Sequence, residues 1–333
     1  MIDVFKRSTR VASPQAKPSY FGSTVVAIAL GNSVYVWHAP TSTTTLLMRT
    51  HSMNDPISSL KWSRDGSKLA VGTTSASVQI WDAEKCSRIR NFQGHRDRVS
   101  VMAWQSQPRG LLSTAGRDST IRNHDMRCVD NVGVYRLHAQ EVCGLSWSPD
   151  NSQLASGGND NVCMVWDAQQ SVNSNRPRLQ LTRHVAAIKA LAWCPFQNRL
   201  LATGGGTADR HIRFWNTNNG KCFGGVDTQS QVCGIVWSTH ERELLTAHGF
   251  SKNQLTIWKY PSMTKVADLT GHSKRVLHLA MSPDETTVCS ASADETLRFW
   301  KVFRAPDRKG AESVRSNTKS GRAGGVLKSL HIR

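Results

Sequence analysis

Residues Glu141–Asp167 read EVCGLSWSPDNSQLASGGNDNVCMVWD and contain the pattern on which the fold depends. An apolar run ends in Trp147, a second ends in paired glycines, and a third ends in Trp166 and Asp167. Ser, Pro, Asn, Asp and Gly separate the runs. Short apolar runs punctuated by these residues are typical of β-strands joined by tight turns. The stretch therefore predicts three consecutive strands.

The third run recurs seven times along the chain, each time ending in an aromatic or His residue followed by a polar residue. The copies are Val34–His38, Val78–Asp82, Ile121–Asp125, Cys163–Asp167, Ile212–Asn216, Leu255–Lys259 and Leu297–Lys301. Their anchors are Trp37, Trp81, His124, Trp166, Trp215, Trp258 and Trp300, which lie 42 to 49 residues apart. A second series precedes the last six by 19 to 22 residues, at Trp62, Trp104, Trp147, Trp193, Trp237 and Met281.

A repeat of about 40 to 45 residues with four short strands and a Trp-Asp ending is typical of WD repeats, which form β-propellers. One such sheet cannot bury both of its faces, so each blade must be sealed by its neighbours. We therefore predict an all-β, seven-bladed propeller over residues 21–303, flanked by basic, flexible tails at 1–20 and 304–333.

Several blades also carry His, Ser or Thr, Asp and Trp at matching positions. The sets are His138, Ser156, Asp160 and Trp166; His184, Thr203, Asp209 and Trp215; and His272, Ser290, Asp294 and Trp300, with His95 and Asp118 as a partial copy. A single such set could suggest a hydrolase. Because the set recurs once per blade, we interpret it as a structural hydrogen-bond network and predict no catalytic residue and no enzyme activity.

Composition and charge restrict the remaining function classes. The chain has 333 residues and a net charge of +18, of which Met1–Tyr20 contributes +3 and Lys301–Arg333 contributes +7. No apolar run approaches the roughly 18 residues of a membrane helix, and the first 20 residues lack the apolar core of a signal peptide. We expect no membrane association. The basic tails are either solvated or in contact with acidic partners or nucleic acid.

No cofactor or metal site is expected from the motifs. The eight cysteines are spread singly without a CxxC pair, so we expect reduced, mostly buried thiols rather than zinc ligands or disulfides. Gly204-Gly205-Gly206 lacks the GK[ST] of a phosphate loop.

Five stretches are more specific than a generic propeller: Glu141–Asp167, Leu200–Asn216, Ser230–Trp237, Glu243–Met263 and Gly271–Trp300. They resemble the Fizzy and Fizzy-related family of substrate-recruiting coactivators of the anaphase-promoting complex, a ubiquitin ligase. His248-Gly249-Phe250 and Ala192–Pro195 favour the Fizzy branch. The final Ile332-Arg333 is similar to the Ile-Arg tail with which the family docks on the ligase.

The resemblance implies a binding site for KEN-box peptides formed by Asn159, Asn161, Thr207, Gln231 and Arg275. An Arg guanidinium presents a planar fork to the peptide Glu, and the amides of Asn and Gln can pair with the peptide Asn and backbone. Without the resemblance, Asn159 and Asn161 would be interpreted as residues that tolerate a tight turn. The resemblance also implies that Glu295 contacts the Arg of a destruction-box peptide.

The sequence departs from the family in two places. The 19–22 spacing puts the inner strand of blade 1 near residue 18, but this segment is polar and contains Pro14 and Pro18. Because Pro lacks the amide that a central strand needs, we predict that blade 1 is incomplete. No segment of Met1–Tyr20 matches the family's C-box, which engages the ligase.

Two functions from different classes follow. The first is a Fizzy-type substrate receptor, nuclear and cytoplasmic, that binds KEN and destruction-box proteins, the ligase and spindle-checkpoint proteins during cell division; a truncated or divergent version would bind substrates without activating the ligase. The second is a basic propeller scaffold for acidic partners or nucleic acid, motivated by the +18 charge. We favour the first and expect no nucleic-acid binding.

Overall fold

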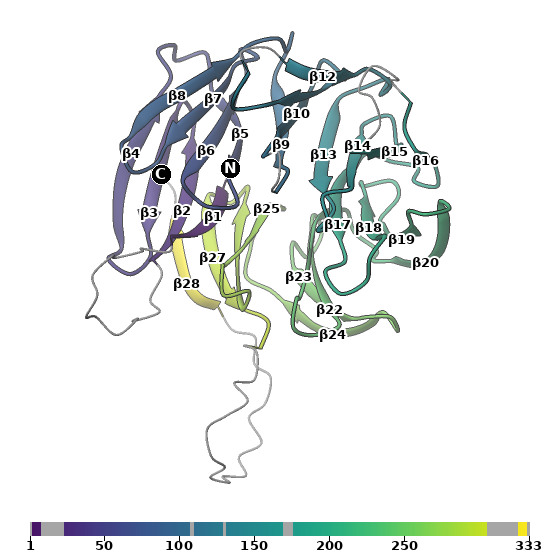
Figure 1. The fold of residues 1–333 in the computed structure, drawn as a ribbon. Coiled ribbons are helices and arrows are strands. Elements are labelled where there is room, and N and C mark those ends of the chain that lie inside the picture. Colours follow the sequence, from purple (N-terminus) through teal and green to yellow (C-terminus); the bar gives the residue numbers. More distant parts are fainter. Residues whose placement is uncertain are drawn as a thin grey trace, which may run out of the picture.

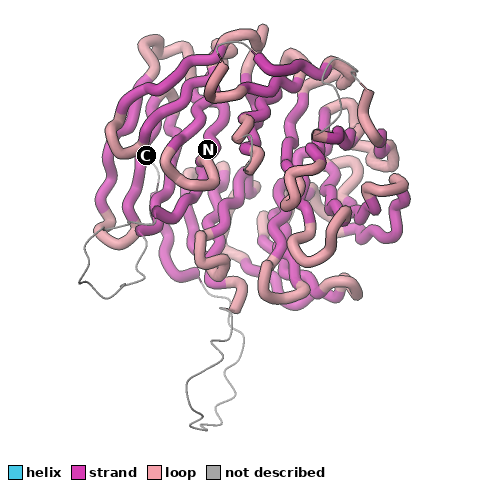
Figure 2. The backbone as a smooth tube through the Cα atoms, in the orientation of Figure 1, coloured by secondary structure: helices cyan, strands magenta, loops and turns pink. Residues whose placement is uncertain are grey.

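The computed structural model describes residues 2–7, 23–106, 110–128, 131–168, 176–304 and 326–331. Within these residues the regular elements are β-strands (Figure 2). They form seven four-stranded antiparallel sheets arranged around a common axis (Figure 1). The predicted seven-bladed propeller is therefore confirmed. In the described part of the chain no helix is long and apolar enough to cross a membrane.

Blades 2 to 6 each use four consecutive strands that run from the axis outward. Blade 2 contains β5 (Ile57–Trp62), β6 (Lys68–Thr73), β7 (Val78–Asp82) and β8 (Ser87–Phe92); blade 3 contains β9 (Val99–Trp104), β10 (Leu112–Gly116), β11 (Ile121–His124) and β12 (Asn131–Tyr135). Blade 4 contains β13 (Val142–Trp147), β14 (Gln153–Gly158), β15 (Cys163–Asp167) and β16 (Leu179–Leu181). Blade 5 contains β17 (Ile188–Trp193), β18 (Leu200–Gly205), β19 (His211–Asn216) and β20 (Lys221–Asp227); blade 6 contains β21 (Val232–Trp237), β22 (Glu243–His248), β23 (Leu255–Lys259) and β24 (Thr264–Leu269).

Blade 1 corrects the sequence prediction, because it has four strands. They are β1 (Ile2–Arg7), β2 (Ser23–Leu30), β3 (Ser33–His38) and β4 (Thr43–Arg49). The innermost strand, β1, pairs antiparallel with β2, with Ile2 opposite Ile28 and Arg7 opposite Ser23. Ile, Val and Phe favour strands, and the Pro-containing segment that the spacing rule selected is not the strand. Residues 2–7 are therefore part of the propeller and not of a flexible tail.

Blade 7 corrects the boundary at the other end of the chain. It contains β25 (Val276–Met281), β26 (Thr287–Ser292), β27 (Thr296–Lys301) and β28 (Val326–His331). The outermost strand, β28, pairs antiparallel with β27, with Leu297 opposite Leu330. Val326–His331 alternates partly between apolar and polar residues, which suits an edge strand. This part of the expected C-terminal tail therefore belongs to the fold.

The seven inner strands close a ring. Each contacts the next around the axis, and β1 contacts both β5 and β25. They enclose a central channel of about 740 Å³, with Cys143, Lys189 and His278 among its lining residues. The ring fixes the relative positions of loops that are far apart in sequence.

The hydrophobic core lies between the blades. Among the residues whose side chains are described there are seven clusters of buried residues, and each is shared by two neighbouring blades. The cluster between blades 7 and 1, for example, joins Val26 and Trp37 to Cys289 and Leu297. Burial of apolar surface stabilises a domain by roughly 25 cal/mol per Å². Adjacent blades thus stabilise one another, as the repeat pattern requires.

Trp residues of the inner strands also connect neighbouring blades by hydrogen bonds. In three cases the indole N–H donates to a backbone carbonyl of the preceding inner strand. The pairs are Trp104 to Lys61 at 3.1 Å, Trp193 to Ser146 at 3.0 Å and Trp237 to Ala192 at 3.2 Å. These three members of the second series therefore join the inner strands of neighbouring blades.

Candidate functional site

One face of the propeller carries two kinds of loop. In every blade the loop from the second to the third strand lies on the same side as the connection that enters the inner strand, because the first and second strands run antiparallel. We call this side the top face. All five predicted KEN-contacting residues lie in these loops and connections or next to them. The ring therefore brings candidate residues from blades 4 to 7 to the same face.

Three of the predicted residues are contiguous. Thr207, in the β18–β19 loop, donates a hydrogen bond from Oγ1 to Oε1 of Gln231, with an O–O distance of 3.4 Å. Gly249 links Gln231 to Arg275: its N–H donates to the Gln231 carbonyl at 3.2 Å, and a Cβ at Gly249 would lie 3.6 Å from the Cβ of Arg275. Thr207 and Arg275 are exposed, and Gln231 is half-buried. They form a polar strip with a positive charge at one end.

The two asparagines occupy the β14–β15 loop of blade 4. Asn159 is exposed, and its N–H donates to the carbonyl of Glu141 at 2.8 Å. Asn161 is half-buried with a φ of 64°, in the left-handed region that Asn tolerates better than most residues. This conformation suits the turn, and the contact of Asn161 with a KEN peptide stays a prediction. The exposed amide of Asn159 faces solvent on the top face.

Glu295 lies in the β26–β27 loop of blade 7. Its side chain is exposed and its φ is 63°. The residue before it, Asp294, is held by His272, which fixes the loop. The opposite wall of the predicted destruction-box groove would come from blade 1, where the side chains of β1 lie outside the described residues. The structure thus places the carboxylate on the top face without describing the groove.

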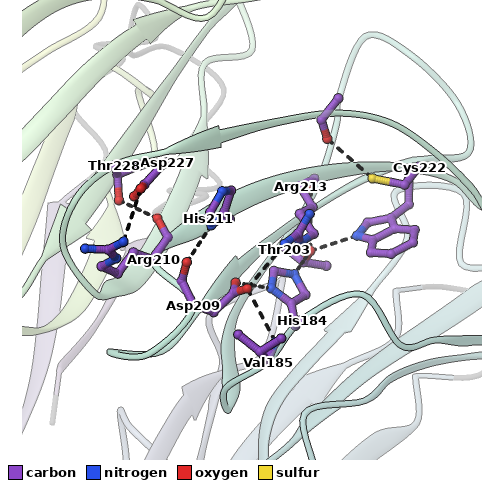
Figure 3. A network of polar contacts seen from close by, with 12 residues as sticks. His184, Val185, Thr203, Asp209, Arg210, His211, Arg213, Cys222, Asp227 and Thr228 are labelled. Carbon is purple, nitrogen blue, oxygen red and sulfur yellow. Dashed lines mark hydrogen bonds and ion pairs between the residues drawn. The ribbon is translucent and has the colours of Figure 1, made fainter.

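The polar tetrads hold these loops from beneath. In blade 5, His184 Nδ1 lies 2.5 Å from Asp209 Oδ2 and Nε2 lies 2.6 Å from Thr203 Oγ1, while the indole N–H of Trp215 donates to Thr203 at 2.8 Å (Figure 3). Corresponding bonds join the blade 4 set, at 2.9, 2.8 and 2.9 Å, and the blade 7 set, at 3.0, 2.7 and 2.8 Å. All three predicted networks are present.

The tetrads position the candidate site directly. Asp160 lies between Asn159 and Asn161 in sequence, Asp209 follows Thr207 by two residues, and Asp294 precedes Glu295. Each Asp joins its loop to the His of the neighbouring connection. The loops that carry Asn159, Thr207 and Glu295 are therefore anchored by hydrogen bonds in the free protein, and pre-organised loops lower the entropic cost of binding a peptide.

The same geometry explains why the His–Ser/Thr–Asp sets are unsuited to nucleophilic catalysis. The carboxylate can only accept, so His Nδ1 must carry the proton and Nε2 accepts from the hydroxyl. The hydroxyl oxygen is occupied by the indole N–H, and Ser156, Thr203 and Ser290 are all 0% exposed. No substrate can reach these hydroxyls, which supports their structural role.

Two further blades contain variants of the network, of which the sequence analysis assigned only His95 and Asp118 in blade 3. In blade 3, Thr114 bonds His95 at 2.7 Å and His124 at 2.8 Å, so His124 replaces the Trp. In blade 6, Thr246 bonds Trp258 and His248, so a strand His replaces the loop His. Thr114 and Thr246 occupy the same position in the second strand of their blades as Ser156 does in blade 4. An alignment of the second strands could have identified them from the sequence.

Burial and hydrogen bonding shift the pKa values of these groups. Burial raises the pKa of Asp118, but hydrogen bonds from His95 and from the backbone N–H of Arg96 outweigh it and leave the pKa well below its usual range. Burial lowers the pKa of His124 to about 3, with the charges of His95 and Arg122 acting in the same direction. Burial likewise lowers the pKa of His248 to about 4. The rings of His124 and His248 are therefore neutral near pH 7.

Other predicted residues lie away from the site or outside the described residues. Ile332 and Arg333 are outside the described part of the chain, as is most of Met1–Tyr20. Among the described residues no group of three or more His, Cys, Asp or Glu could hold a metal ion. All eight cysteines are free, and four of them, Cys163, Cys194, Cys233 and Cys289, are buried as apolar residues.

Comparison with known proteins places this geometry in a family. The family model of the CDC20/Fizzy WD40 domain matches residues 19–300. The anaphase-promoting complex subunit cdc20 of Dictyostelium discoideum is 54% identical over 286 residues, covering 85% of this chain and 56% of that protein. Cell division cycle 20.1, cofactor of APC complex, from Arabidopsis thaliana is 52% identical, covering 85% and 62%. Protein FIZZY-RELATED 3 of Arabidopsis thaliana is 50% identical, covering 84% and 56%.

A solved structure agrees with the sequence matches. A chain of the crystal structure of the mitotic checkpoint complex superposes with a TM-score of 0.80 at 43% sequence identity, covering 84% of this chain and 87% of that chain. The matched region spans 56% to 62% of the length of the three curated relatives. The similarity thus concerns the propeller, and it includes relatives from both the cdc20 and the Fizzy-related branches.

Proposed function

Because this chain belongs to the CDC20/Fizzy WD40 family, we propose that it is a substrate receptor of the anaphase-promoting complex that binds KEN-box peptides on its top face. One observation carries the proposal. Thr207, Gln231 and Arg275 come from loops of blades 5, 6 and 7 and form one contiguous strip, and Asn159 lies on the same face. No single segment of the chain could supply such an arrangement.

The chemistry of the strip suits a short extended peptide. The guanidinium of Arg275 can form two parallel hydrogen bonds to the carboxylate of the peptide Glu. The amides of Gln231 and Asn159 each offer both a donor and an acceptor to the peptide Asn and to its backbone. Because Asn159 and Arg275 are exposed and Gln231 is only half-buried, each contact is modest, and affinity depends on their cooperation on a pre-organised surface.

Glu295 extends the proposal to a second motif. Its exposed carboxylate is available to the Arg of a destruction box. A substrate that carries both motifs would gain from bivalency, because the second motif binds at high effective concentration. The protein would then act by proximity, holding substrate lysines near the ligase while forming no covalent bond itself.

The partners in this proposal are the ligase, its substrates and spindle-checkpoint proteins. The names of the relatives and of the checkpoint-complex structure support them. Ile332 and Arg333 are the proposed docking residues for the ligase, and the site of action is the nucleus and cytoplasm. A version that recruits substrates without activating the ligase differs only in a reconstituted ubiquitination assay, where substrates would bind but would not be modified.

A peptide titration tests the proposed site. We expect a fluorescent KEN peptide to bind the wild-type chain and to lose about tenfold or more in affinity on Arg275→Ala, because the peptide carboxylate loses its charged partner. The matched control is Arg64→Ala, which removes an exposed arginine from the opposite face. Equal affinities for the wild type and Arg275→Ala would reject the site.

A further inference from the structure

Phe250 is an exposed aromatic residue beside the proposed peptide site. Its side chain is 86% exposed, more than any other large hydrophobic residue in the described part of the chain. It lies in the β22–β23 loop of blade 6, one residue after Gly249, whose N–H donates to the carbonyl of Gln231 and whose added Cβ would lie 3.6 Å from the Cβ of Arg275. The proposed function assigns no role to Phe250.

The loop that carries Phe250 is held on several sides. Ser230 Oγ donates to the carbonyl oxygens of Phe250 at 3.0 Å and of Gly249 at 3.2 Å. The N–H of Asn253 donates to Gly249 at 3.0 Å, and its side-chain amide donates to Ser273 in the next connection at 3.1 Å. Phe250 is therefore presented to solvent by an anchored backbone, which is the arrangement of a binding anchor.

The surroundings of Phe250 are positively charged. Lys252 lies two residues further along the same loop, and Lys274 and Arg275 lie on the connection to which Asn253 is bonded. All three side chains are exposed. Phe250 and three exposed cations thus lie on one loop and on the connection bonded to it, and this combination complements a peptide segment that carries an apolar residue and acidic residues.

We propose that Phe250 is a specificity-determining residue that contacts an apolar side chain flanking the KEN triplet, in a segment that also carries Asp or Glu. The inference rests on the proposed function, because the occupant is the same peptide that Arg275 holds. It narrows the substrate class. Among KEN-bearing proteins, those with an apolar residue in an acidic stretch next to the triplet bind more tightly.

A peptide series tests this contact. Each peptide carries KEN in an acidic context with one Leu at one of the three positions on either side, and a parent peptide has Ala at all six. We expect at least one Leu position to raise affinity for the wild type by about three- to tenfold, and Phe250→Ala to remove that gain while leaving affinity for the parent peptide unchanged. Phe250→Leu keeps an apolar side chain and should retain most of the gain.

Two controls keep the result interpretable. Met53→Ala removes a similarly exposed apolar side chain, 84% exposed, from the connection between blades 1 and 2 on the same face, and it should change none of the affinities. If no Leu position helps, or if Phe250→Ala weakens all peptides equally, the contact is rejected. Loss of binding in Arg275→Ala with no Phe250 effect would reject this inference alone, whereas no effect of Arg275→Ala would reject the proposed function.

Discussion

At the scale of single residues, a buried hydroxyl in the second strand joins the His and the Trp of a blade. Ser156, Thr203 and Ser290 each bond one His and one Trp. Blade 2 has Val71 at the corresponding position, where it packs in the core shared with blade 1. The hydroxyl is present in blades 3 to 7, where Thr114 and Thr246 complete the series. The candidate KEN residues lie within this range, in blades 4 to 7 and their connections.

The buried His rings predict how stability depends on pH. His124 and His248 have folded-state pKa values of about 3 and about 4, whereas an unfolded His titrates near 6.5. Between these values the unfolded chain binds more protons, so the free energy of unfolding falls as pH falls below about 6.5. Burial also lowers the pKa values of His184 and His272, so these residues add to the same pH dependence.

The variant His124→Trp isolates one of these groups. Trp at this position restores the indole donor of the other blades and removes a titrating ring. With a folded-state pKa of about 3, His124 accounts for about 2 kcal/mol of stability that is lost between pH 7 and pH 5. We therefore expect the free energy of unfolding of the variant, measured with denaturant, to fall by about 2 kcal/mol less between pH 7 and pH 5 than that of the wild type. This difference does not depend on the absolute stability of the variant. Parallel pH curves for the variant and the wild type would contradict this assignment.

At the scale of elements, the sequence predicts the middle of the fold better than its ends. The Trp series identified the inner and third strands of the blades, because a residue that bonds a neighbouring blade must recur at fixed spacing. The prediction that blade 1 is incomplete was wrong, because the spacing rule assumes a short connection, and residues 8–22 separate β1 from β2. β28 was missed because it follows a polar, Gly-containing stretch without an anchor.

A proline pair tests whether Ile2–Arg7 closes the ring. Amides of consecutive strand residues point in opposite directions, so at least one of Asp3 and Val4 donates toward β2. The double variant Asp3→Pro/Val4→Pro should lose about 3 kcal/mol or more, seen as a fall in the melting temperature of about 5 °C or more. The control Asp3→Ser/Val4→Thr keeps both amides and should melt close to the wild type. Equal melting of the two variants would show that β1 does not contribute.

At the scale of the whole molecule, the site depends on ring closure. Asn159 and Arg275 are 116 positions apart in sequence, and only the seven-bladed geometry brings their loops to one face. No local pattern predicts this: the residues were named through the family resemblance, and the topology then placed them together. Phe250 was noted only as a branch marker, because exposure is a property of the folded molecule.

A charge swap between peptide and protein tests the central claim most directly. In an affinity titration of a KEN peptide, changing the peptide Glu to Lys, or Arg275→Glu in the protein, should each weaken binding about tenfold or more. If the two groups are in contact, combining both changes restores an ion pair and recovers much of the affinity, giving a coupling energy of about 1–3 kcal/mol. Losses that simply add in the double change would contradict recognition of the KEN peptide by Arg275 on this face.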